Sequence, residues 1–357
     1  MNKLFVTCSS LSSGGAERVL SILSSSFAEQ YDEVQYLMWY DKPVFYDIDA
    51  RVKVVSIEKE AGSGDTAKRM LWFRKYVNRC HPDMVLSFSA PFNMLTLASL
   101  LCTRHKVIAA ERVDPRSFRW GKPMELLRNI LYRRAYGILA QTQSCKDYFT
   151  GKLYDKTDVI FNPVNMPESL RGSAIGCEKQ HLIINAARLA PQKKQDMLVR
   201  VFARFHESHP EYRLQIFGSG PERDNLIALA EDLNISSYVE MPGTVKDLWS
   251  RMQVADMFVM TSLFEGMSNS MIEAMCLGVP CISTKVSGAV DLIDSGNNGI
   301  LIDINDSEAL YDAMSRIADD EEYARTIANN SCLLYDKLNV ESISARWIEY
   351  VDSKMNC

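Results

Sequence analysis

The sequence predicts an α/β protein made of two doubly wound domains, and three features of the chain support this prediction. Its 357 residues correspond to roughly two domains of about 100–200 residues each. Short apolar runs alternate with amphipathic stretches, as in parallel sheets covered by helices on both faces. Residues 162–180 lack periodicity and are rich in Pro and Gly, which indicates an interdomain linker. We therefore expect domains at 1–165 and 180–339, with a helix in 340–357 packing back on the first.

The predicted elements alternate in order along the chain. The strands expected in the first domain are 4–8, 34–40, 52–57, 84–88, 107–110, 138–140 and 159–161. Those of the second domain are 182–186, 213–217, 238–241, 257–260, 281–284 and 299–302. Helical patterns include 16–29, 123–134, 194–206, 221–233, 270–277, 307–317 and 340–351. Ligands of such sheets bind beyond the carboxyl ends of the strands, so we look for function in the motifs that follow strands.

Composition excludes several classes of protein. The formal net charge of −5 argues against a general nucleic-acid binder, which would be basic. Nine cysteines without a CxxC pair indicate free thiols in a reducing compartment. The apolar run at the N-terminus is too short for a signal peptide, and no stretch has the length of a membrane span. We therefore expect a cytoplasmic protein.

Three glycine-containing turns are candidates for binding a phosphorylated ligand. Gly14 and Gly15 follow the first predicted strand and open a helix, whose N-terminus offers free N–H groups and a positive dipole end to an anion. The turns at 217–223 and 242–245 have the same small-residue character. A plain tight turn between strand and helix is the alternative for each, and the residues alone leave both interpretations open.

Two cations follow the first strand of the second domain. Arg188 leaves the end of this strand, and Lys193 lies five residues further on, at the start of the next helix. Arginine offers paired planar donors and lysine a point charge, which together suit a diphosphate. Solvent-facing charges are the alternative, and we favour the binding role for the pair.

Two carboxylates flank a small polar turn after the strand at 257–260. Glu265 falls in the loop, and Glu273 falls in a helix between apolar neighbours. A lone carboxylate among apolar residues loses hydration unless it is paired or used. Such a pair can accept hydrogen bonds from sugar hydroxyls at one end and ribose hydroxyls at the other. The alternative places Glu265 in solvent and Glu273 on the helix surface.

These segments together resemble the family 4 glycosyltransferases, of the type that builds bacterial surface polysaccharides. The matching segments, in order, are GGAERV (14–19), ARLAPQKK (187–194), FGSGPER (217–223), PGTV (242–245) and SLFEGMSNSMIEAMCLGVPCIST (262–284). The last contains the E-x7-E signature as Glu265 and Glu273, and the resemblance spans essentially the whole chain. It implies the GT-B fold, with two Rossmann-like domains facing a cleft, and transfer from a nucleotide sugar with retention of configuration.

The resemblance also implies roles for individual residues. Arg188 and Lys193 would hold the donor diphosphate, Glu265 the hydroxyls of the transferred sugar, and Glu273 the ribose. The other implied donor-site residues are Gly266, Met267, Ser268 and Asn269 at sugar and phosphate, Gly218, Gly243, Thr244 and Val245 at the base, and Gly14 and Gly15 at diphosphate or acceptor.

One departure from the family concerns the first domain, where many relatives carry a His after a strand. This chain has Glu111 and Arg112 there, and we expect Arg112 to contact phosphate or acceptor. The family usually needs no metal, so we expect neither a metal nor another cofactor. The DxD-like sequence Asp47-Ile48-Asp49 is interpreted as accidental.

For the substrates, the resemblance implies transfer of a hexose or N-acetylhexosamine to a glycan or polyprenyl-diphosphate-linked acceptor in capsule, exopolysaccharide or O-antigen assembly. Ser268 stands where many relatives carry Pro, which favours a UDP-sugar donor. Two alternatives are a nucleotide-sugar epimerase or hydrolase on the same fold and a non-catalytic nucleotide-binding scaffold. The missing cleft His weakens the first, and intact donor motifs weaken the second.

A basic segment, residues 104–134, offers a second surface. It contains nine Lys or Arg against three acidic residues, and apolar side chains interleave with them. A basic amphipathic helix can bind the cytoplasmic face of an anionic membrane. The alternative is a solvated helix whose apolar side joins the core, and both interpretations remain open.

Overall fold

The computed structural model describes residues 2–12, 14–62, 64–117 and 120–356. The chain divides into two compact units, residues 1–165 with 338–357 and residues 166–337. Each unit contains one parallel sheet with helices packed on it, so the predicted pair of doubly wound α/β domains is confirmed. Within the described ranges, no helix is both long enough and apolar enough to cross a membrane.

The first unit is built on a seven-stranded sheet in the order β3-β2-β1-β4-β5-β6-β7. Its strands are β1 (Lys3–Cys8), β2 (Glu33–Met38), β3 (Lys53–Ser56), β4 (Met84–Phe88), β5 (Val107–Glu111), β6 (Gly137–Ala140) and β7 (Thr157–Val159). All neighbouring pairs are parallel. Strands β1 and β4 form the topological switch point, the place at which sheets of this kind usually bind ligands.

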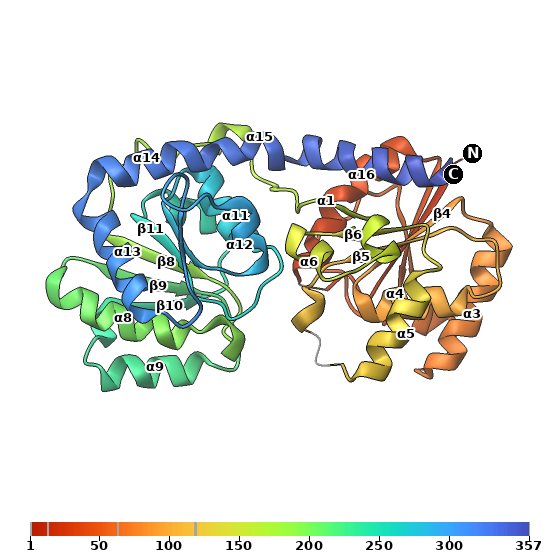
Figure 1. Ribbon diagram of the computed structural model, residues 1–357, viewed down its shortest axis with the longest axis horizontal. Coiled ribbons are helices and arrows are strands. Elements are labelled where there is room, and N and C mark those ends of the chain that lie inside the picture. Colours follow the sequence, from red (N-terminus) through yellow and green to blue (C-terminus); the bar gives the residue numbers. More distant parts are fainter. Residues whose placement is uncertain (1, 13, 63, 118–119, 357) are drawn as a thin grey trace. The chain divides into compact units, whose positions relative to one another are not determined.

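Helices cover both faces of this sheet (Figure 1). They are α1 (Gly15–Gln30), α2 (Ile57–Glu60), α3 (Thr66–Cys80), α4 (Ala90–Ser99), α5 (Lys122–Tyr132), α6 (Gln143–Asp147), α7 (Lys152–Asp155) and α16 (Val340–Met355). The start of α3 is fixed by Asp65, whose carboxylate accepts a hydrogen bond from the Lys68 N–H, the usual N-cap arrangement.

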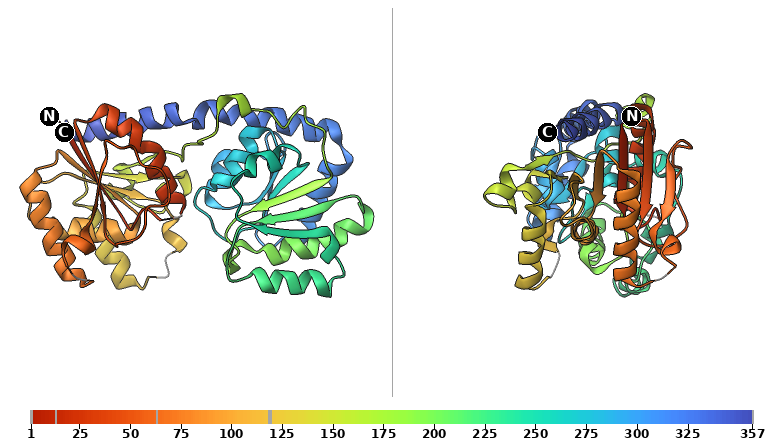
Figure 2. Two further views of the ribbon diagram at one scale, coloured as in Figure 1. Left: turned by 180° about the vertical axis from the view of Figure 1, so that it is seen from behind. Right: turned by 90° about the vertical axis from the view of Figure 1, so that its right-hand side faces the viewer.

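The C-terminal helix α16 belongs to the first unit. It packs beside α1, and Figure 2 shows the two helices together from behind. Trp347 is fully buried, and its ring stacks on Phe88 at the end of β4, with centroids 5.5 Å apart. The Tyr31 hydroxyl donates to Asp352 at 3.0 Å. The helix therefore contributes core side chains and is not an appendage.

The second unit is built on a six-stranded parallel sheet in the order β10-β9-β8-β11-β12-β13. Its strands are β8 (Leu182–Ala186), β9 (Arg213–Phe217), β10 (Val239–Gly243), β11 (Met257–Met260), β12 (Cys281–Thr284) and β13 (Ile300–Ile302). Every residue of β8, β11 and β12 is buried, as expected for central strands covered on both faces. Here the switch point lies between β8 and β11.

The helices of the second unit include one group on each face of its sheet. They are α8 (Gln195–Ser208), α9 (Arg223–Asp232), α10 (Leu248–Gln253), α11 (Asn269–Leu277), α12 (Ser287–Leu292), α13 (Ser307–Asp319), α14 (Glu321–Ser331) and α15 (Tyr335–Leu338). Helices α8 and α9 lie side by side, with α11 on the opposite side of the sheet (Figure 1). Phe202 and Phe205 of α8 carry the apolar core against β8 and β9.

Residues 162–180 were predicted to be an interdomain linker, but residues 166–180 belong to the second unit. The Gly172 and Ala174 N–H groups donate to the carbonyls of Cys276 and Leu277, both at 2.9 Å. These carbonyls end α11 and would otherwise lack partners. Arg171 adds an ion pair with Asp336 at 2.6 Å. The absence of periodicity therefore reflects an irregular but attached segment.

Candidate functional site

Two loops meet at the switch point of the second unit, one after β8 and one after β11. The Thr261 hydroxyl is placed to bond the carbonyls of Lys193 and Lys194, each at 2.9 Å. The Leu263 N–H donates to the carbonyl of Gln192 at 2.8 Å. Because β8 and β11 are neighbours, their following loops leave the same edge and can be joined in this way. The joined loops carry the predicted cations and the first predicted carboxylate.

Lys193 and Glu265 form an ion pair at this junction. Their side chains are 11% and 18% exposed, so both are largely withdrawn from water. Burial lowers the pKa of the Lys193 ammonium from its ordinary 10.5 to about 8, while the facing carboxylate favours the charged form. Lys193 is therefore a cation at neutral pH and is paired with a carboxylate.

The pKa of Lys193 predicts an alkaline limit on donor use. Its charge is present below about pH 8 and is lost as pH rises through that value, so kcat/KM for a nucleotide-sugar donor is expected to fall above it. In Lys193→Arg the guanidinium stays protonated to about pH 12, so the fall should disappear. Initial rates at subsaturating donor measure this limit. If kcat/KM of the arginine variant fell at the same pH, the fall would be due to another titrating group.

Arg188 lies on the same loop, directly after β8, and its side chain is exposed. Its backbone carbonyl accepts a hydrogen bond from Gln195 Nε2 at 3.2 Å, which ties it to the start of α8. Among the described residues, no hydrogen bond or ion pair engages its guanidinium. The structure thus brings Arg188 to the edge that carries Lys193 and Glu265, with its planar donors available to an anion.

The turn at 266–269 leads into α11. Ser268 caps the helix, accepting a hydrogen bond from the Met271 N–H at 3.4 Å, and the Ser270 hydroxyl donates to the carbonyl of Ala186 at 2.6 Å. The start of the helix is therefore tied to the end of β8. Gly266 and Met267 are buried, whereas Ser268 and Asn269 are half-buried. Backbone N–H groups at this helix start suit a phosphate or a sugar oxygen.

Glu273 lies one turn into α11 and is 4% exposed. It is therefore neither a solvent-facing residue nor a member of the helix's outer surface. Buried carboxylates are retained where they accept strong hydrogen bonds. This burial agrees with the interpretation in which Glu273 is used, and a ribose contact stays a prediction.

Gly288 of α12 is a supporting residue that the sequence did not reveal. A Cβ at this position would overlap the carbonyl oxygen of Gly266 and lie 2.8 Å from the Cα of Met267. Helix α12 therefore packs its backbone directly against the 266–267 turn, which only glycine permits. The V-S-G-A-V sequence after β12 offered one signal, a glycine at the start of a helical pattern.

We expect Gly288→Ala to displace the 266–269 turn. Overpacking of this kind costs about 1–3 kcal/mol, so the melting temperature should fall, and donor affinity should fall about tenfold or more. Differential scanning calorimetry and nucleotide titration measure the two effects. Gly176→Ala is the control, because a Cβ at Gly176 meets nothing within 4 Å. Normal donor affinity in Gly288→Ala would show that the turn tolerates displacement.

The residues predicted to line the base pocket follow β9 and end β10. Gly218 has φ of 126° and its N–H donates to the carbonyl of Gly243 at 2.9 Å. A Cβ at Gly218 would overlap the Ala187 carbonyl, so this turn lies against the start of the Arg188 loop. Thr244 is exposed and Val245 half-buried just beyond. The structure places these residues at the same sheet edge as Arg188.

In the first unit, the glycine turn follows β1. Gly14 is the N-cap of α1 with extended backbone, and Gly15 is the first helical residue and exposed. The neighbouring Ser13 of this motif lies outside the described residues. The Ser9 hydroxyl donates to Glu17 in the first turn of α1 at 3.0 Å. The exposed helix start is compatible both with phosphate binding and with a plain tight turn between strand and helix.

Arg112 lies inside the first unit and is only 6% exposed. Its guanidinium donates to Asn162 and lies over the rings of Phe88 and Trp347, at 5.5 and 5.7 Å from their centroids. Burial lowers its pKa to about 10, so it remains charged. A contact with phosphate or acceptor, as the sequence predicted, would require the side chain to leave this position.

Glu111, beside it, is fully buried at the end of β5. It accepts a hydrogen bond from the Tyr132 hydroxyl, and burial raises its pKa to about 7. Tyr132 also accepts from Asn93 Nδ2 at 3.0 Å. These groups form a polar network within the unit. Glu111 is therefore placed to support β5 and α5 and does not face solvent.

In the part of the chain that the structure describes, the acidic side chains are not gathered into a metal-binding group. Across the described ranges, no group of three or more His, Cys, Asp or Glu side chains is arranged to hold a metal ion. In the DxD-like segment, Asp49 is engaged by the Arg51 guanidinium at 2.8 and 2.9 Å. The accidental interpretation of that segment stays a prediction.

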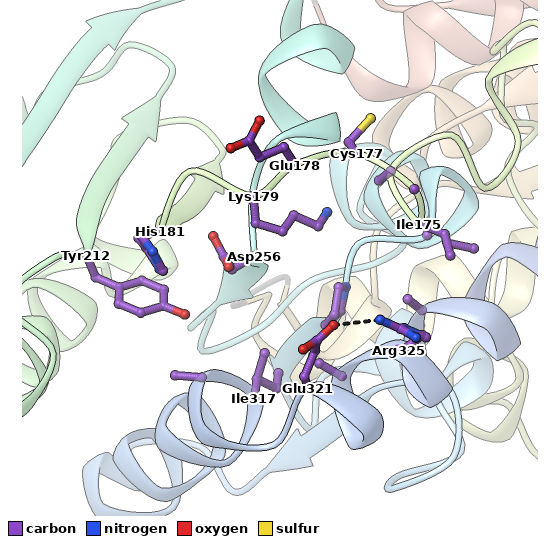
Figure 3. A pocket seen from close by; sticks show the side chains of 17 residues that line it. Ile175, Cys177, Glu178, Lys179, His181, Tyr212, Asp256, Ile317, Glu321 and Arg325 are labelled. Carbon is purple, nitrogen blue, oxygen red and sulfur yellow. Dashed lines mark hydrogen bonds and ion pairs between the residues drawn. The ribbon is translucent and has the colours of Figure 1, made fainter.

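A cavity of about 720 Å³ in the second unit lies away from these loops (Figure 3). Its lining includes His181, Tyr212 and Asp256, which directly precede β8, β9 and β11. It therefore lies at the amino ends of the strands, opposite the edge that carries Arg188. None of the residues predicted for the donor lines it.

Comparison with known proteins identifies the chemistry. Residues 173–332, which carry the joined loops, match the family model described as glycosyl transferases group 1. The protein is a glycosyltransferase. The chain is 23% identical, over the full length of both proteins, to a Campylobacter jejuni N-acetylgalactosaminyltransferase acting on GalNAc-α-(1→4)-GalNAc-α-(1→3)-diNAcBac-PP-undecaprenol. It is also 23% identical to the Erwinia amylovora amylovoran biosynthesis glycosyltransferase AmsD, covering 97% of this chain and 99% of that one.

Solved structures identify the fold of this glycosyltransferase as GT-B. The crystal structure of Anabaena HepE in complex with UDP superposes with a TM-score of 0.82 at 20% identity, over 99% of this chain and all of that one. A sucrose-phosphate synthase from Thermosynechococcus elongatus gives 0.83 at 16% identity, over 99% of each chain. The predicted fold class is confirmed. The relatives named in these comparisons do not favour the epimerase, hydrolase or scaffold alternatives.

Proposed function

We propose that this glycosyltransferase moves a hexose or N-acetylhexosamine from a UDP-sugar, with retention of configuration, to a glycan carried on a polyprenyl diphosphate. The observation that carries the proposal is the junction of the two loops at the second switch point. There Lys193 meets Glu265, and Arg188 leaves the same edge. Two cations and a helix start are complementary to the diphosphate of a nucleotide sugar, and the carboxylate is complementary to the hydroxyl groups of its sugar.

The roles follow from the polarity of these groups. Arg188 and Lys193 neutralise the diphosphate as it departs, which is the largest contribution expected for such a transfer. Glu265 exchanges its contact with Lys193 for hydroxyl groups of the donor sugar. Glu273 accepts from the ribose, and the backbone at 266–269 contacts the sugar and phosphate. We propose that no metal ion is needed, so EDTA should leave the rate unchanged.

The acceptor class is supported by relatives that align with this chain over almost its whole length. The Campylobacter jejuni enzyme is named for an undecaprenol-diphosphate-linked acceptor, and AmsD for amylovoran biosynthesis. HepE was crystallised with UDP. We propose the same classes of acceptor and nucleotide here, at the cytoplasmic face of a membrane, for the assembly of a capsule, exopolysaccharide or O-antigen.

Label transfer tests the proposal. Radiolabelled UDP-hexoses and UDP-N-acetylhexosamines are incubated with the protein and a synthetic polyprenyl-diphosphate disaccharide. Label is expected in the lipid product, with an α-linkage by NMR when the donor is α-linked. Thermal shift with UDP and GDP checks the nucleotide, because a ligand at 100 times its Kd stabilises by about 2.7 kcal/mol. Release of free sugar without transfer would indicate a hydrolase, and a β-linked product would contradict retention.

Helix α5 supports the proposed contact with the membrane. Met124, Leu126, Leu127 and Ile130 are 44–61% exposed on its surface, whereas Leu131 and Arg128, two residues of the basic segment, are buried. Arg119 of that segment lies outside the described residues. Exposed apolar side chains beside cationic residues suit the boundary of an anionic leaflet.

We therefore expect the protein to float with anionic vesicles at low salt. Replacing Leu126, Leu127 and Ile130 by serine should weaken binding at least tenfold, because each buried Leu or Ile contributes about 1.5–3 kcal/mol. Leu71→Ser on α3, at a residue 59% exposed, is the control. Flotation of the triple variant at wild-type levels would assign α5 to another role.

A further inference from the structure

Residues 44–46, in the loop between β2 and β3, form an apolar run in which Val44 and Phe45 are exposed and Tyr46 is half-buried. Val44 is 46% exposed and Phe45 is 66% exposed, the latter the most exposed of the large apolar side chains described. The Phe45 and Tyr46 rings meet edge to face, with centroids 5.0 Å apart. Val44 and Phe45 therefore form a small apolar surface, supported from one side by the half-buried Tyr46 ring, that a ligand can cover.

The backbone of this loop is held in place at the ligand-binding edge of the first sheet. The Phe45 N–H donates to the carbonyl of Leu11 at 2.9 Å, and the Tyr40 N–H to that of Ser9 at 2.9 Å. The Ser21 hydroxyl of α1 donates to the carbonyl of Asp47 at 2.7 Å. The loop therefore runs beside the segment that leads from β1 into the Gly14 turn, and Phe45 is exposed from an anchored backbone.

The surroundings of the ring favour a carbohydrate. A pyranose presents one face of C–H groups and an edge of hydroxyls, so it is matched by an aromatic ring beside polar groups. Exposed charged residues lie on both sides of the apolar run, Asp41 and Lys42 before it and Asp47 after it. An isoprenoid chain would instead favour a wider continuous apolar surface than these few side chains provide.

We propose that Phe45 and Tyr46 form a carbohydrate-binding subsite for the acceptor glycan, stacking on a sugar ring and thereby setting acceptor specificity. The proposal rests on the proposed transfer to a glycan acceptor and adds its recognition element. Phe45 supplies the flat surface, and the Tyr46 ring supports it edge to face, as aromatic pairs prefer.

Four variants test the subsite with a polyprenyl-diphosphate disaccharide as acceptor probe. Phe45→Ala is expected to raise the acceptor KM about five- to tenfold, in the range of an aromatic stacking contact, with UDP affinity unchanged. Phe45→Trp should keep or lower this KM. Phe45→Leu keeps apolar volume but not the flat face, and should behave like alanine. Leu71→Ala, at an apolar position on α3 that is 59% exposed, is the control.

Saturation-transfer NMR with free hexose and N-acetylhexosamine disaccharides tests the same subsite without catalysis. Wild-type protein should transfer saturation to the sugar C–H protons, and Phe45→Ala should lose at least half of this signal. If Phe45→Leu kept a wild-type KM, the ring would contact lipid, and the proposal would be overturned. It would equally be overturned by a wild-type acceptor KM in Phe45→Ala or by no saturation transfer from wild type. A wild-type protein that does not bind UDP would overturn the proposed function. The NMR experiment does not depend on UDP, so it would still show whether the subsite binds sugars.

Discussion

Arg188→Ala is expected to lower kcat/KM for the nucleotide-sugar donor by about 10²–10³-fold, the cost of removing one preorganised donor at a developing negative charge. Its side chain is exposed just after the end of β8. Because an exposed side chain contributes little to the packed core, its removal should leave the fold intact. Most of the effect should fall on kcat, because the diphosphate gains charge as the sugar departs. Steady-state rates at varied donor concentration separate kcat from KM.

Arg200→Ala is the matched control for this measurement. Arg200 is also exposed, but it lies on the outer surface of α8, so its removal should leave both constants unchanged. Arg188→Lys should recover part of the loss, because lysine retains the charge without the paired planar donors. An Arg188→Ala enzyme within threefold of wild type would remove Arg188 from the donor site.

Glu273→Gln is expected to weaken UDP binding about 10–100-fold, since a hydrogen bond to a charged group contributes about 1.5–3 kcal/mol. The amide keeps the shape of a side chain that is 4% exposed within α11, so packing of the helix should persist. Isothermal titration calorimetry with UDP gives the affinity. Glu231→Gln, at an exposed position of α9, controls for the change of charge.

A UDP analogue that lacks both ribose hydroxyls identifies the partner of Glu273. Wild-type protein should bind this analogue as weakly as the glutamine variant binds UDP. The glutamine variant should bind the analogue almost as well as it binds UDP, because the interaction between Glu273 and the ribose is already absent from it. Independent, additive losses would show that Glu273 does not bind the ribose.

The regular elements could be predicted from the sequence because their hydrophobic patterns are local. Strands 84–88, 182–186 and 257–260 were predicted with the bounds that the structure shows for β4, β8 and β11. Strand 34–40 was predicted to end two residues later than β2 does, because Trp39 is as apolar as the strand before it and is also buried. Helices α3 and α4 were absent from the expected set. In α4, apolar residues lie on most sides and give a weak helical period.

Long-range contacts at the site could not be read from the chain. The approach of Lys193 to Glu265 depends on β8 and β11 being neighbours, and their pairing order follows from the whole sheet. The burial of Arg112 depends on Trp347, which lies more than two hundred residues away in the sequence. Motif spacing identified which residues follow strands. It could not show which of them the fold would cover.

The place of α16 in the first unit has a consequence for synthesis. The ribosome completes residues 166–337 before it reaches Trp347, so the second unit is an insertion within the first. While the nascent chain emerges, the first sheet lacks the indole that packs on Phe88. Domains generally fold as units during synthesis. The first unit should therefore acquire its native core only after the second unit has been synthesised.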